Sequence, residues 1–378
     1  MIYLDNSSTT KPYREAVETA VKYMTDIFGN PSSLHGIGLD AEKAVREARG
    51  YTADLISADP SCITFTGGGT EADNMAILGT ARRMKRQGKR IITTKTEHPA
   101  VLEPCAYLEK LGYDVIYLDV DSEGYIDMDQ LKDSVNDETI LISVMHVNNE
   151  LGTVNDIRKA ASLKKNALFH TDAVQSLGKE HIDVSDADID LLSMSGHKIH
   201  GPKGTGALYI RKGVSVEPLV MGGGQERGMR SGTENVPGIA GFGCAARMAA
   251  DIDRRSALMA LARNHLLEGI KGTIPDVRIN SPENGCPSVL NVSFLGTRGE
   301  VILHMLEDEG IYVSTGSACS SNKKGQSHVL KAAGLTQEEI EGAIRFSFSE
   351  FNTPDEMDIV LEKLESIVRR FRKLGKFR

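Results

Sequence analysis

Short apolar runs alternate with segments of helical period between about residue 40 and residue 250. The runs lie at residues 62–66, 90–96, 114–120, 139–147, 166–172 and 188–195, and helices are expected from Glu71 and from Ala100. Apolar runs that alternate with helices in this way are typical of an α/β domain with a largely parallel sheet. Such sheets bind ligands at the carboxyl ends of their strands, so the residues that follow each run are the candidates for chemistry.

The pattern changes in the last third of the chain. One long helical stretch is expected from Pro237 to about Ile270. Shorter strands are then expected at 277–280, 288–295, 311–315 and 343–349, with helices at 298–309, from 337, and from Pro354, where Thr353 suits the N-cap. We therefore predict a large domain over residues 14–255 and a smaller α+β domain over residues 256–378, with residues 1–13 packing back on the second domain.

Composition and charge narrow the class of protein. Apolar residues make up 40% and charged residues 25% of the 378 residues, as in globular proteins. The formal net charge of −8 argues against direct binding of nucleic acid through a basic surface. The basic run Arg369, Arg370, Arg372, Lys373, Lys376 and Arg378 is interpreted as the solvated face of a last helix, with contact to an acidic partner or RNA as the alternative.

The sequence carries no export or membrane signal. The segment MIYLDNSSTTKP has neither a basic n-region nor an apolar h-region, and no stretch approaches the roughly 18 apolar residues of a membrane span. The five cysteines are scattered, without a CxxC pair or neighbouring histidines, so no metal site is predicted. Free thiols in a chain without an export signal indicate a reducing, cytoplasmic location.

A glycine-rich turn, TFTGGGTEADN at residues 64–74, joins an expected strand to an expected helix. Glycines let backbone N–H groups approach an anion, and the helix dipole adds to the attraction, so the turn suits a phosphate. Thr70 and Asp73 have the spacing of a capping box. The alternative is a plain turn before a capped helix, and the sequence fits neither a P-loop nor a dinucleotide-binding fingerprint.

Three polar side chains end or follow apolar runs. Asp172 suits a protonated ring nitrogen of a cofactor, or else caps the next helix. Lys198, in SMSGHKIHGPKGTG, suits a Schiff-base lysine, or else lies on a surface loop. His98, in KTEHPA, suits ring stacking or proton transfer, or else a helix cap. Together with the glycine turn, these side chains fit one pocket.

The remaining candidates are polar or basic segments. Arg345 lies in an apolar run, where a guanidinium needs an anion, either a bound carboxylate or an internal acid. MHVNNELG, residues 145–152, suits a polar pocket floor or a turn, and GGGQERGMRSGTENVPG, residues 222–238, suits a second anion-binding loop or an exposed connection. Cys319 lies alone among small residues in STGSACSSNKKGQSHVL, residues 314–330, where Lys323 and Lys324 favour a thiolate or face an acidic surface.

Taken together, the motifs TGGGTEADN, TEHPAV, MHVNNELG, HTDAVQSLGK, SMSGHKIHGPKGTG, GGGQERGMRSGTENV and GSACSS resemble those of the cysteine desulfurases, NifS/IscS-like members of the class V aminotransferases. The resemblance covers essentially the whole chain, with the motifs in the family's order. The resemblance implies fold type I of the pyridoxal 5'-phosphate-dependent enzymes.

The resemblance also implies the site residues. Lys198 would bind the cofactor covalently, Asp172 would pair with its ring nitrogen, Gln175 would contact its ring hydroxyl, and His98 would stack on the ring and assist proton transfer. Gly69, Thr70, Ser195 and His197 would hold the phosphate, and Thr233 would reach the phosphate of the other subunit in a homodimer. Arg345 and Asn149 would bind the substrate carboxylate, with Asn148 as the alternative to Asn149.

The implied reaction converts L-cysteine to L-alanine. Cys319, on a loop that moves, would take the sulfur as a persulfide and pass it to an acceptor protein, either an iron–sulfur cluster scaffold or a tRNA thiolation enzyme. The basic residues after GSACSS depart from the family pattern and leave that acceptor open. The alternatives are a selenocysteine lyase, another aminotransferase of the class, and a non-catalytic interaction module; the last is disfavoured by intact Lys198, Asp172, His98 and Cys319.

Overall fold

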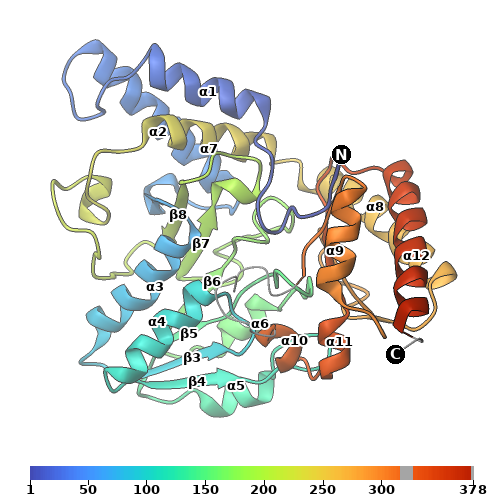
Figure 1. The fold of residues 1–378 in the computed structure, drawn as a ribbon. Helices are drawn as coiled ribbons and strands as arrows, with labels where there is room; N and C mark the ends of the chain where they lie inside the picture. Colours follow the sequence, from blue (N-terminus) through green and yellow to red (C-terminus); the bar gives the residue numbers. More distant parts are fainter. Residues whose placement is uncertain (316–326, 376–378) are drawn as a thin grey trace.

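The computed structural model describes residues 1–315 and 327–375 (Figure 1). Its largest element is a seven-stranded sheet with the order β2-β8-β7-β6-β5-β3-β4. The strands are β2 (Ile63–Thr66), β3 (Arg90–Thr94), β4 (Asp114–Leu118), β5 (Thr139–Ser143), β6 (Leu168–Asp172), β7 (Leu191–Ser195) and β8 (Gly206–Ile210). Only β8, within this sheet, runs antiparallel to its neighbours β2 and β7. The predicted α/β class with a mostly parallel sheet is confirmed.

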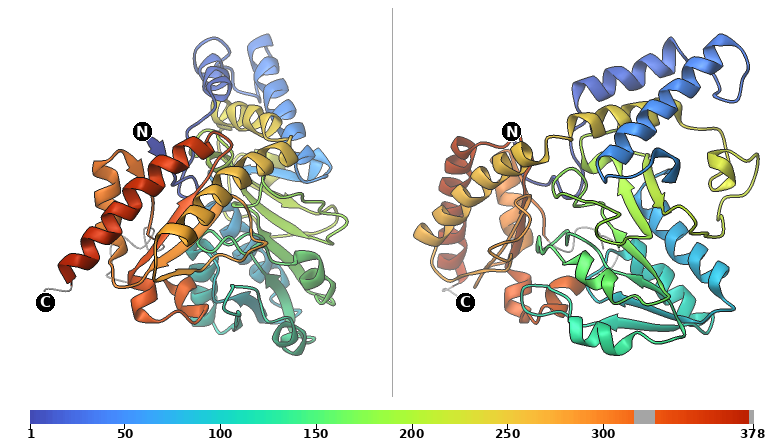
Figure 2. Two further views of the ribbon diagram at one scale, coloured as in Figure 1. Left: turned by 90° about the vertical axis from the view of Figure 1, so that its right-hand side faces the viewer. Right: turned by 180° about the vertical axis from the view of Figure 1, so that it is seen from behind.

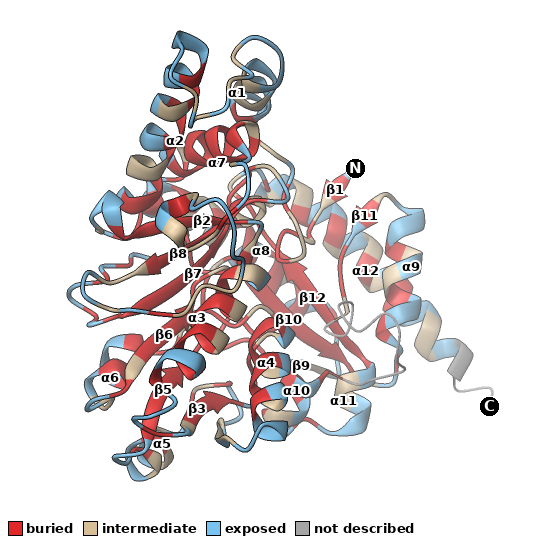
Figure 3. Cartoon of the chain, turned by 90° about the vertical axis from the view of Figure 1, so that its left-hand side faces the viewer, coloured by how far each residue is buried: buried red, intermediate tan, exposed pale blue. Residues whose placement is uncertain are grey.

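Helices cover both faces of this sheet. On one face, α3 (Gly69–Met84) and α4 (Pro99–Lys110) share a buried apolar cluster with the strands. On the other face lie α2 (Gly36–Asp54), α5 (Met128–Ser134), α6 (Ile157–Ser162) and α7 (Val236–Met248), and α1 (Arg14–Thr25) packs on α7. Adjacent strand residues point to opposite clusters, as Leu191 and Leu192 do. Burial on both faces therefore explains why these strands read as continuous apolar runs (Figure 3).

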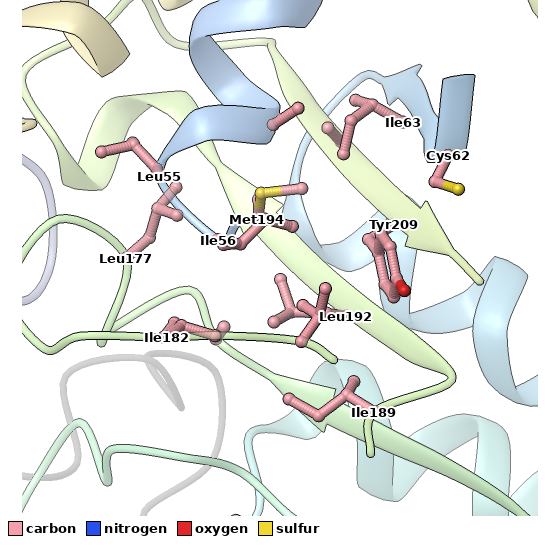
Figure 4. Close-up of a cluster of buried hydrophobic side chains, with 14 of the residues drawn as sticks. Leu55, Ile56, Cys62, Ile63, Leu177, Ile182, Ile189, Leu192, Met194 and Tyr209 are labelled. Atoms are coloured by element: carbon pink, nitrogen blue, oxygen red, sulfur yellow. The ribbon is translucent and has the colours of Figure 1, made fainter. Parts of the chain in front are cut away.

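The close-up in Figure 4 shows part of the cluster on the α2 side of the sheet. Leu192 and Met194 of β7 and Tyr209 of β8 meet Leu55 and Ile56, which follow α2. The 3-10 turn η1 (Pro60–Cys62) then leads into β2. This packing fixes the strand ends from which the polar side chains project.

A second, smaller sheet has its own apolar cluster. The antiparallel strands β12 (Ala343–Ser347), β10 (Val289–Phe294) and β9 (Val277–Ile279) form it, and β1 (Ile2–Tyr3) pairs in parallel with β11 (Ile311–Tyr312) nearby. The helices of this part are α8 (Ile252–Thr273), α9 (Gly299–Asp308), α10 (His328–Ala332), α11 (Gln337–Glu341) and α12 (Pro354–Gly375). α8 and α12 pack together on the side turned away from the large sheet (Figure 2). The boundary expected near residue 255 stays a prediction.

Two local expectations are wrong. The helical stretch expected from Pro237 to about Ile270 is two helices, because the Asp251 side chain accepts a hydrogen bond from the Arg254 N–H and so begins α8 afresh. The capping box expected at Thr70 and Asp73 is absent, because α3 already begins at Gly69 and its N-cap is Gly68. The cap expected at Thr353 is present: its hydroxyl accepts a 3.3 Å hydrogen bond from the Glu356 N–H. Of the helices in the described chain, none is long and apolar enough to cross a membrane.

Candidate active site

The carboxyl ends of the parallel strands bring the predicted polar residues to one edge of the large sheet. Asp172 is the last residue of β6, and β7 leads directly into the 3-10 turn η2 (Gly196–Lys198). β2 leads into the glycine turn before α3, and β3 leads to His98 at the start of α4. This is the edge at which α/β sheets bind ligands.

A cavity of about 800 Å³ opens at this edge. Its lining includes all four residues predicted to hold a phosphate, Gly69, Thr70, Ser195 and His197. Ser8, Thr9, Gly67, Gly68, Glu71, Asn74, Lys203 and Gly204 complete the lining. The structure therefore brings these four predicted residues, from two separate segments, to one space.

The glycine turn suits a phosphate for a steric reason. α3 begins at Gly69 without a side-chain cap, so its first N–H groups and its dipole face the cavity end of the helix. A Cβ at Gly69 would lie 2.6 Å from Val174 Cγ2 and 3.5 Å from Ser195 Cβ. Only glycine fits this position without displacing Val174, and the close backbone approach is what an anion site at a helix N-terminus requires.

Lys198 lies half-buried beside this cavity. Its Nζ donates a 2.9 Å hydrogen bond to the carbonyl oxygen of Ser8 and another to the carbonyl oxygen of Ser7. Its neighbour His197 accepts or donates a 3.1 Å hydrogen bond through Nδ1 with Thr9 Oγ1. Residues 7–9 therefore contact both His197 and Lys198, the adjacent side chains of η2.

Asp172 is buried, and its Oδ1 accepts a 2.8 Å hydrogen bond from the Val174 N–H. Burial raises the pKa of this carboxyl to about 6, although the Val174 hydrogen bond and the Lys198 charge oppose the shift. Gln175, three residues on, donates through Nε2 to the Ser7 carbonyl at 2.9 Å and accepts from Lys179 Nζ at 3.4 Å. A cationic ring placed against Asp172 would lower its pKa again and hold it ionised.

His98 caps a helix, which is one of the two roles that the sequence left open. Its Nδ1 accepts a 3.1 Å hydrogen bond from the Ala100 N–H and caps α4. Burial, followed by the charges of Lys198 and His328, lowers the pKa of His98 to about 4, so the imidazole is neutral near neutral pH. It lines a second cavity of about 450 Å³, which shares Thr70 and Asn74 with the first. A cap at Nδ1 leaves the ring face and Nε2 for chemistry.

Arg345 is buried in β12, and an internal acid pairs with it. Its Nη2 donates to Asp5 Oδ1 and to Ser8 Oγ, both at 2.8 Å, and its Nη1 donates to the Asn149 carbonyl at 3.0 Å. Of the two asparagines, Asn148 is fully engaged, because its amide donates to the Thr96 carbonyl and accepts from the N–H groups at 150 and 151. Asn149 is the amide that remains for a ligand.

Thr233 is exposed and does not line either cavity at this edge. Cys319 lies outside the described residues. The arginines of the loop at 222–238 are already engaged: Arg230 pairs with Glu71 at 2.8 Å, and Arg227 donates to the carbonyls of residues 61 and 63. The expected second anion site on that loop therefore finds no support in these two side chains.

Sequence reasoning missed the segment at residues 5–9 and three buried acids. Asp5, Ser7, Ser8 and Thr9 touch the side chains of Arg345, Lys198, Gln175 and His197. Burial raises the pKa of Asp73 well above its ordinary value, that of Glu97 to about 8 and that of Glu150 to about 7. The sequence feature that could have pointed to the segment at 5–9 is a run of six small or polar residues directly after the apolar residues 2–4. No cluster in the described part of the chain has the donors to hold a metal ion.

Known proteins resemble this chain over almost its whole length. The family model for class-V aminotransferases matches residues 2–360. The cysteine desulfurase IscS of Methanosarcina thermophila is 47% identical over 378 residues, 99% of this chain and 93% of the relative. A solved NifS-like protein superposes with a TM-score of 0.92 at 38% identity, covering 97% of this chain and 99% of its own. SspA, solved in complex with cysteine, has a TM-score of 0.84 at 36% identity, covering 93% of this chain and 100% of its own.

Proposed function

The chain belongs to the class-V aminotransferase family and is a cysteine desulfurase, and from this premise we propose how its own residues carry the reaction. The substrate is L-cysteine, as in the complex of the related SspA. The observation that carries the proposal is the placement of Lys198, Asp172, His98 and the glycine turn around one edge of the sheet. The products are L-alanine and a persulfide on Cys319.

Pyridoxal 5'-phosphate fits this site. Gly69, Thr70, Ser195 and His197 would hold its phosphate, and the uncapped start of α3 supplies the backbone N–H groups. Lys198 would bind it covalently, Asp172 would face its ring nitrogen, and Gln175 would face its ring hydroxyl. When bound, the cofactor supplies an electron sink for the charge that forms at the substrate Cα.

The side chains then divide the remaining work. Asp172, ionised against the cofactor's ring nitrogen, would favour the protonated form of that nitrogen. Lys198 Nζ donates hydrogen bonds to the Ser7 and Ser8 carbonyls in this structure. Once the amine leaves these carbonyls, it accepts the α-proton of the substrate. His98 stays neutral because of burial, so Nε2 is able to accept or return a proton near the ring. Arg345 and Asn149 bind the substrate carboxylate.

Cys319 completes the reaction as the sulfur acceptor. Its thiolate attacks the sulfur of the bound cysteine, an S–S bond forms, and the substrate C–S bond breaks with its electrons moving to the carbon. Protonation of that carbon gives alanine, so L-cysteine and one thiol yield L-alanine and one persulfide. The persulfide then passes to an acceptor, which we propose is an iron–sulfur cluster scaffold or a tRNA thiolation enzyme.

Mass measurement of the peptide that contains Cys319, after incubation with L-cysteine, tests this function. One added sulfur on that peptide is the expected result. Cys319→Ala should keep the absorbance of the bound cofactor and lose the persulfide. Cys62, Cys105, Cys244 and Cys286 are buried, so they serve as internal controls that should gain no sulfur. Wild-type rates of alanine formation from the alanine variant would contradict the role of Cys319.

We also propose a cytoplasmic homodimer. Large exposed apolar side chains lie on α1, on the connection to α2 and at the start of the 220–234 loop: Val17, Val21, Met24, Phe28, Leu34 and Met221. Single exposed apolar residues are normal, but such a concentration favours a protein partner, and a second copy would take Thr233 to its own cavity. Light scattering at micromolar concentration should give twice the chain mass, and Thr233→Ala should weaken cofactor binding in the dimer.

A further inference from the structure

Arg345 has a resident counter-ion. The guanidinium is buried, and a buried charge is stable only with an anion beside it. Asp5 supplies this anion at 2.8 Å from Nη2, and Ser8 Oγ links the pair by donating to Asp5 Oδ1 at 2.7 Å while accepting from Arg345 at 2.8 Å. Glu150 also faces the guanidinium, but its Oε2 accepts from Ser327 instead. Among the described residues, Asp5 is the acid that Arg345 contacts directly.

The backbone fixes Asp5 in this place. Asp5 forms a parallel bridge with Ser347, two residues beyond Arg345 in β12. The N–H of Asn6 donates to the Ser347 carbonyl, and the N–H of Ser7 donates to Ser347 Oγ at 2.9 Å. The carboxylate is therefore held by strand-like pairing and does not depend on the guanidinium for its position.

One donor of Arg345 is left over. Its Nε is buried and has no hydrogen-bond partner, whereas Nη1 and Nη2 are both engaged. A buried donor without a partner is rare in a folded protein, so Arg345 has hydrogen-bonding capacity that Asp5, Ser8 and Asn149 do not use. A substrate carboxylate drawn to Arg345 would meet a guanidinium whose charge Asp5 already balances.

We infer that Asp5 sets how strongly this enzyme holds carboxylate-bearing ligands, by remaining the counter-ion of Arg345 when substrate or product is bound. The inference rests on the proposed role of Arg345. Without the Asp5 charge, the ligand-free protein would keep an unbalanced buried cation, while a bound carboxylate would neutralise it. Removing the charge therefore destabilises the free protein more than the complex and strengthens carboxylate binding.

The functional consequence concerns product release. L-Alanine carries the same carboxylate as L-cysteine. An Arg345 without a resident counter-ion would therefore retain the product as well as attract the substrate. A resident acid weakens both interactions and lets alanine leave. Asp5 therefore weakens the binding of the carboxylate that substrate and product share. At saturating substrate concentration, the faster release of alanine raises the turnover rate.

The test compares Asp5→Asn with the wild type, both loaded with cofactor, for binding of L-alanine and of ethylamine, which is alanine without its carboxylate. Calorimetry should show alanine binding to the variant about tenfold more tightly, the effect of a close charge. Ethylamine affinity should not change. With L-cysteine, KM should fall and kcat should not rise. The apparent thermal midpoint of the ligand-free variant should also fall, and alanine should restore it.

Asp358→Asn is the matched control, because Asp358 is an exposed acid on α12 that pairs with His265 at 2.6 Å. The ligand affinities of this variant should equal those of the wild type. If D5N does not fold, Asp5→Ser tests the same direction. Alanine affinity that is unchanged or weaker, or equal shifts for alanine and ethylamine, would overturn the inference. A wild type that does not desulfurate L-cysteine would instead overturn the proposed function.

Discussion

Ser327 Oγ donates a 2.5 Å hydrogen bond to Glu150 Oε2, and both residues are buried. Glu150 belongs to the turn whose Asn149 carbonyl accepts from Arg345 Nη1. Ser327 caps α10, since its hydroxyl also accepts from the Leu330 N–H at 3.0 Å. One buried carboxyl thus ties the start of α10 to the residues proposed to bind the substrate carboxylate.

This carboxyl should leave a mark on the pH dependence of stability. Burial raises the pKa of Glu150 from its ordinary 4.5 to about 7, so between these values the folded chain keeps a proton that the unfolded chain loses. The free energy of unfolding therefore falls as pH rises through this window, by on the order of 3 kcal/mol. Glu150→Gln keeps an oxygen acceptor for Ser327 and removes the titration.

Thermal unfolding at about pH 5 and about pH 8 measures the effect, and the wild-type midpoint should fall by roughly 5 °C more than that of E150Q. Glu283→Gln, at an exposed glutamate, should follow the wild type. Parallel pH curves for the wild type and E150Q would show that Glu150 is already ionised in the folded protein at the lower pH.

Lys198 should be the point of covalent attachment of the cofactor. Lys198→Ala should lose the absorbance band of the attached cofactor, and borohydride should fix no cofactor to the chain. Lys203, which lines the cavity beside Lys198, gives the matched variant: Lys203→Ala should still be labelled by borohydride on the peptide that contains residue 198. Labelling of any other lysine in the wild type would remove Lys198 from this role.

The two roles of His98 should separate by substitution. Asparagine is a good N-cap, so His98→Asn should keep α4 capped, whereas His98→Ala should lose about 1 kcal/mol of stability with the cap. Both variants lose the imidazole, so desulfuration should fall by at least about a hundredfold in each. Urea unfolding and alanine formation measure the two effects. An asparagine variant with wild-type turnover would assign His98 to the fold alone.

The steric argument at Gly69 predicts a rescue. Gly69→Ala places a Cβ within 2.6 Å of Val174 Cγ2, so the turn must shift and its N–H groups must move from the phosphate. Cofactor affinity, measured by absorbance titration, should fall about tenfold, the change that 1.4 kcal/mol produces. Val174→Ala removes the clashing methyl, and the double variant should regain most of the affinity. Failure of that rescue would place the cause elsewhere than at this contact.

Periodicity predicted the parts of the site that lie at strand ends. Asp172 ends an apolar run, Lys198 and His98 follow apolar runs, and the parallel order of β3, β6 and β7 places all three at one edge. These runs are continuous because the strands are buried on both faces, which makes them easy to recognise. Local turn chemistry was less predictable: Gly68 at the N-cap of α3 and Asp251 at that of α8 decide helix limits that the apolar pattern does not mark.

The contacts of residues 5–9 were beyond prediction from local pattern. Asp5 meets Arg345, and the Ser7 carbonyl accepts from both Lys198 and Gln175, across long sequence separations. A polar side chain shows in the sequence that it needs a partner, as Arg345 did, but the sequence does not show which acid will provide it. The ion pair between Arg345 and Asp5 identifies that acid, and the bridge between Asp5 and Ser347 places it there.

The same bridge has a consequence for synthesis. Residues 5–9 leave the ribosome some 340 residues before Ser347 and Arg345. Until then the apolar side chains of Ile2 and Leu4 have no cluster to join, because their neighbours lie in β10, α9 and β12. Contacts of such long separation form late in folding. A chain truncated before β12 would therefore carry residues 5–9 without the β12 pairing that positions them against Lys198, so the complete cofactor site should form only once β12 has been made.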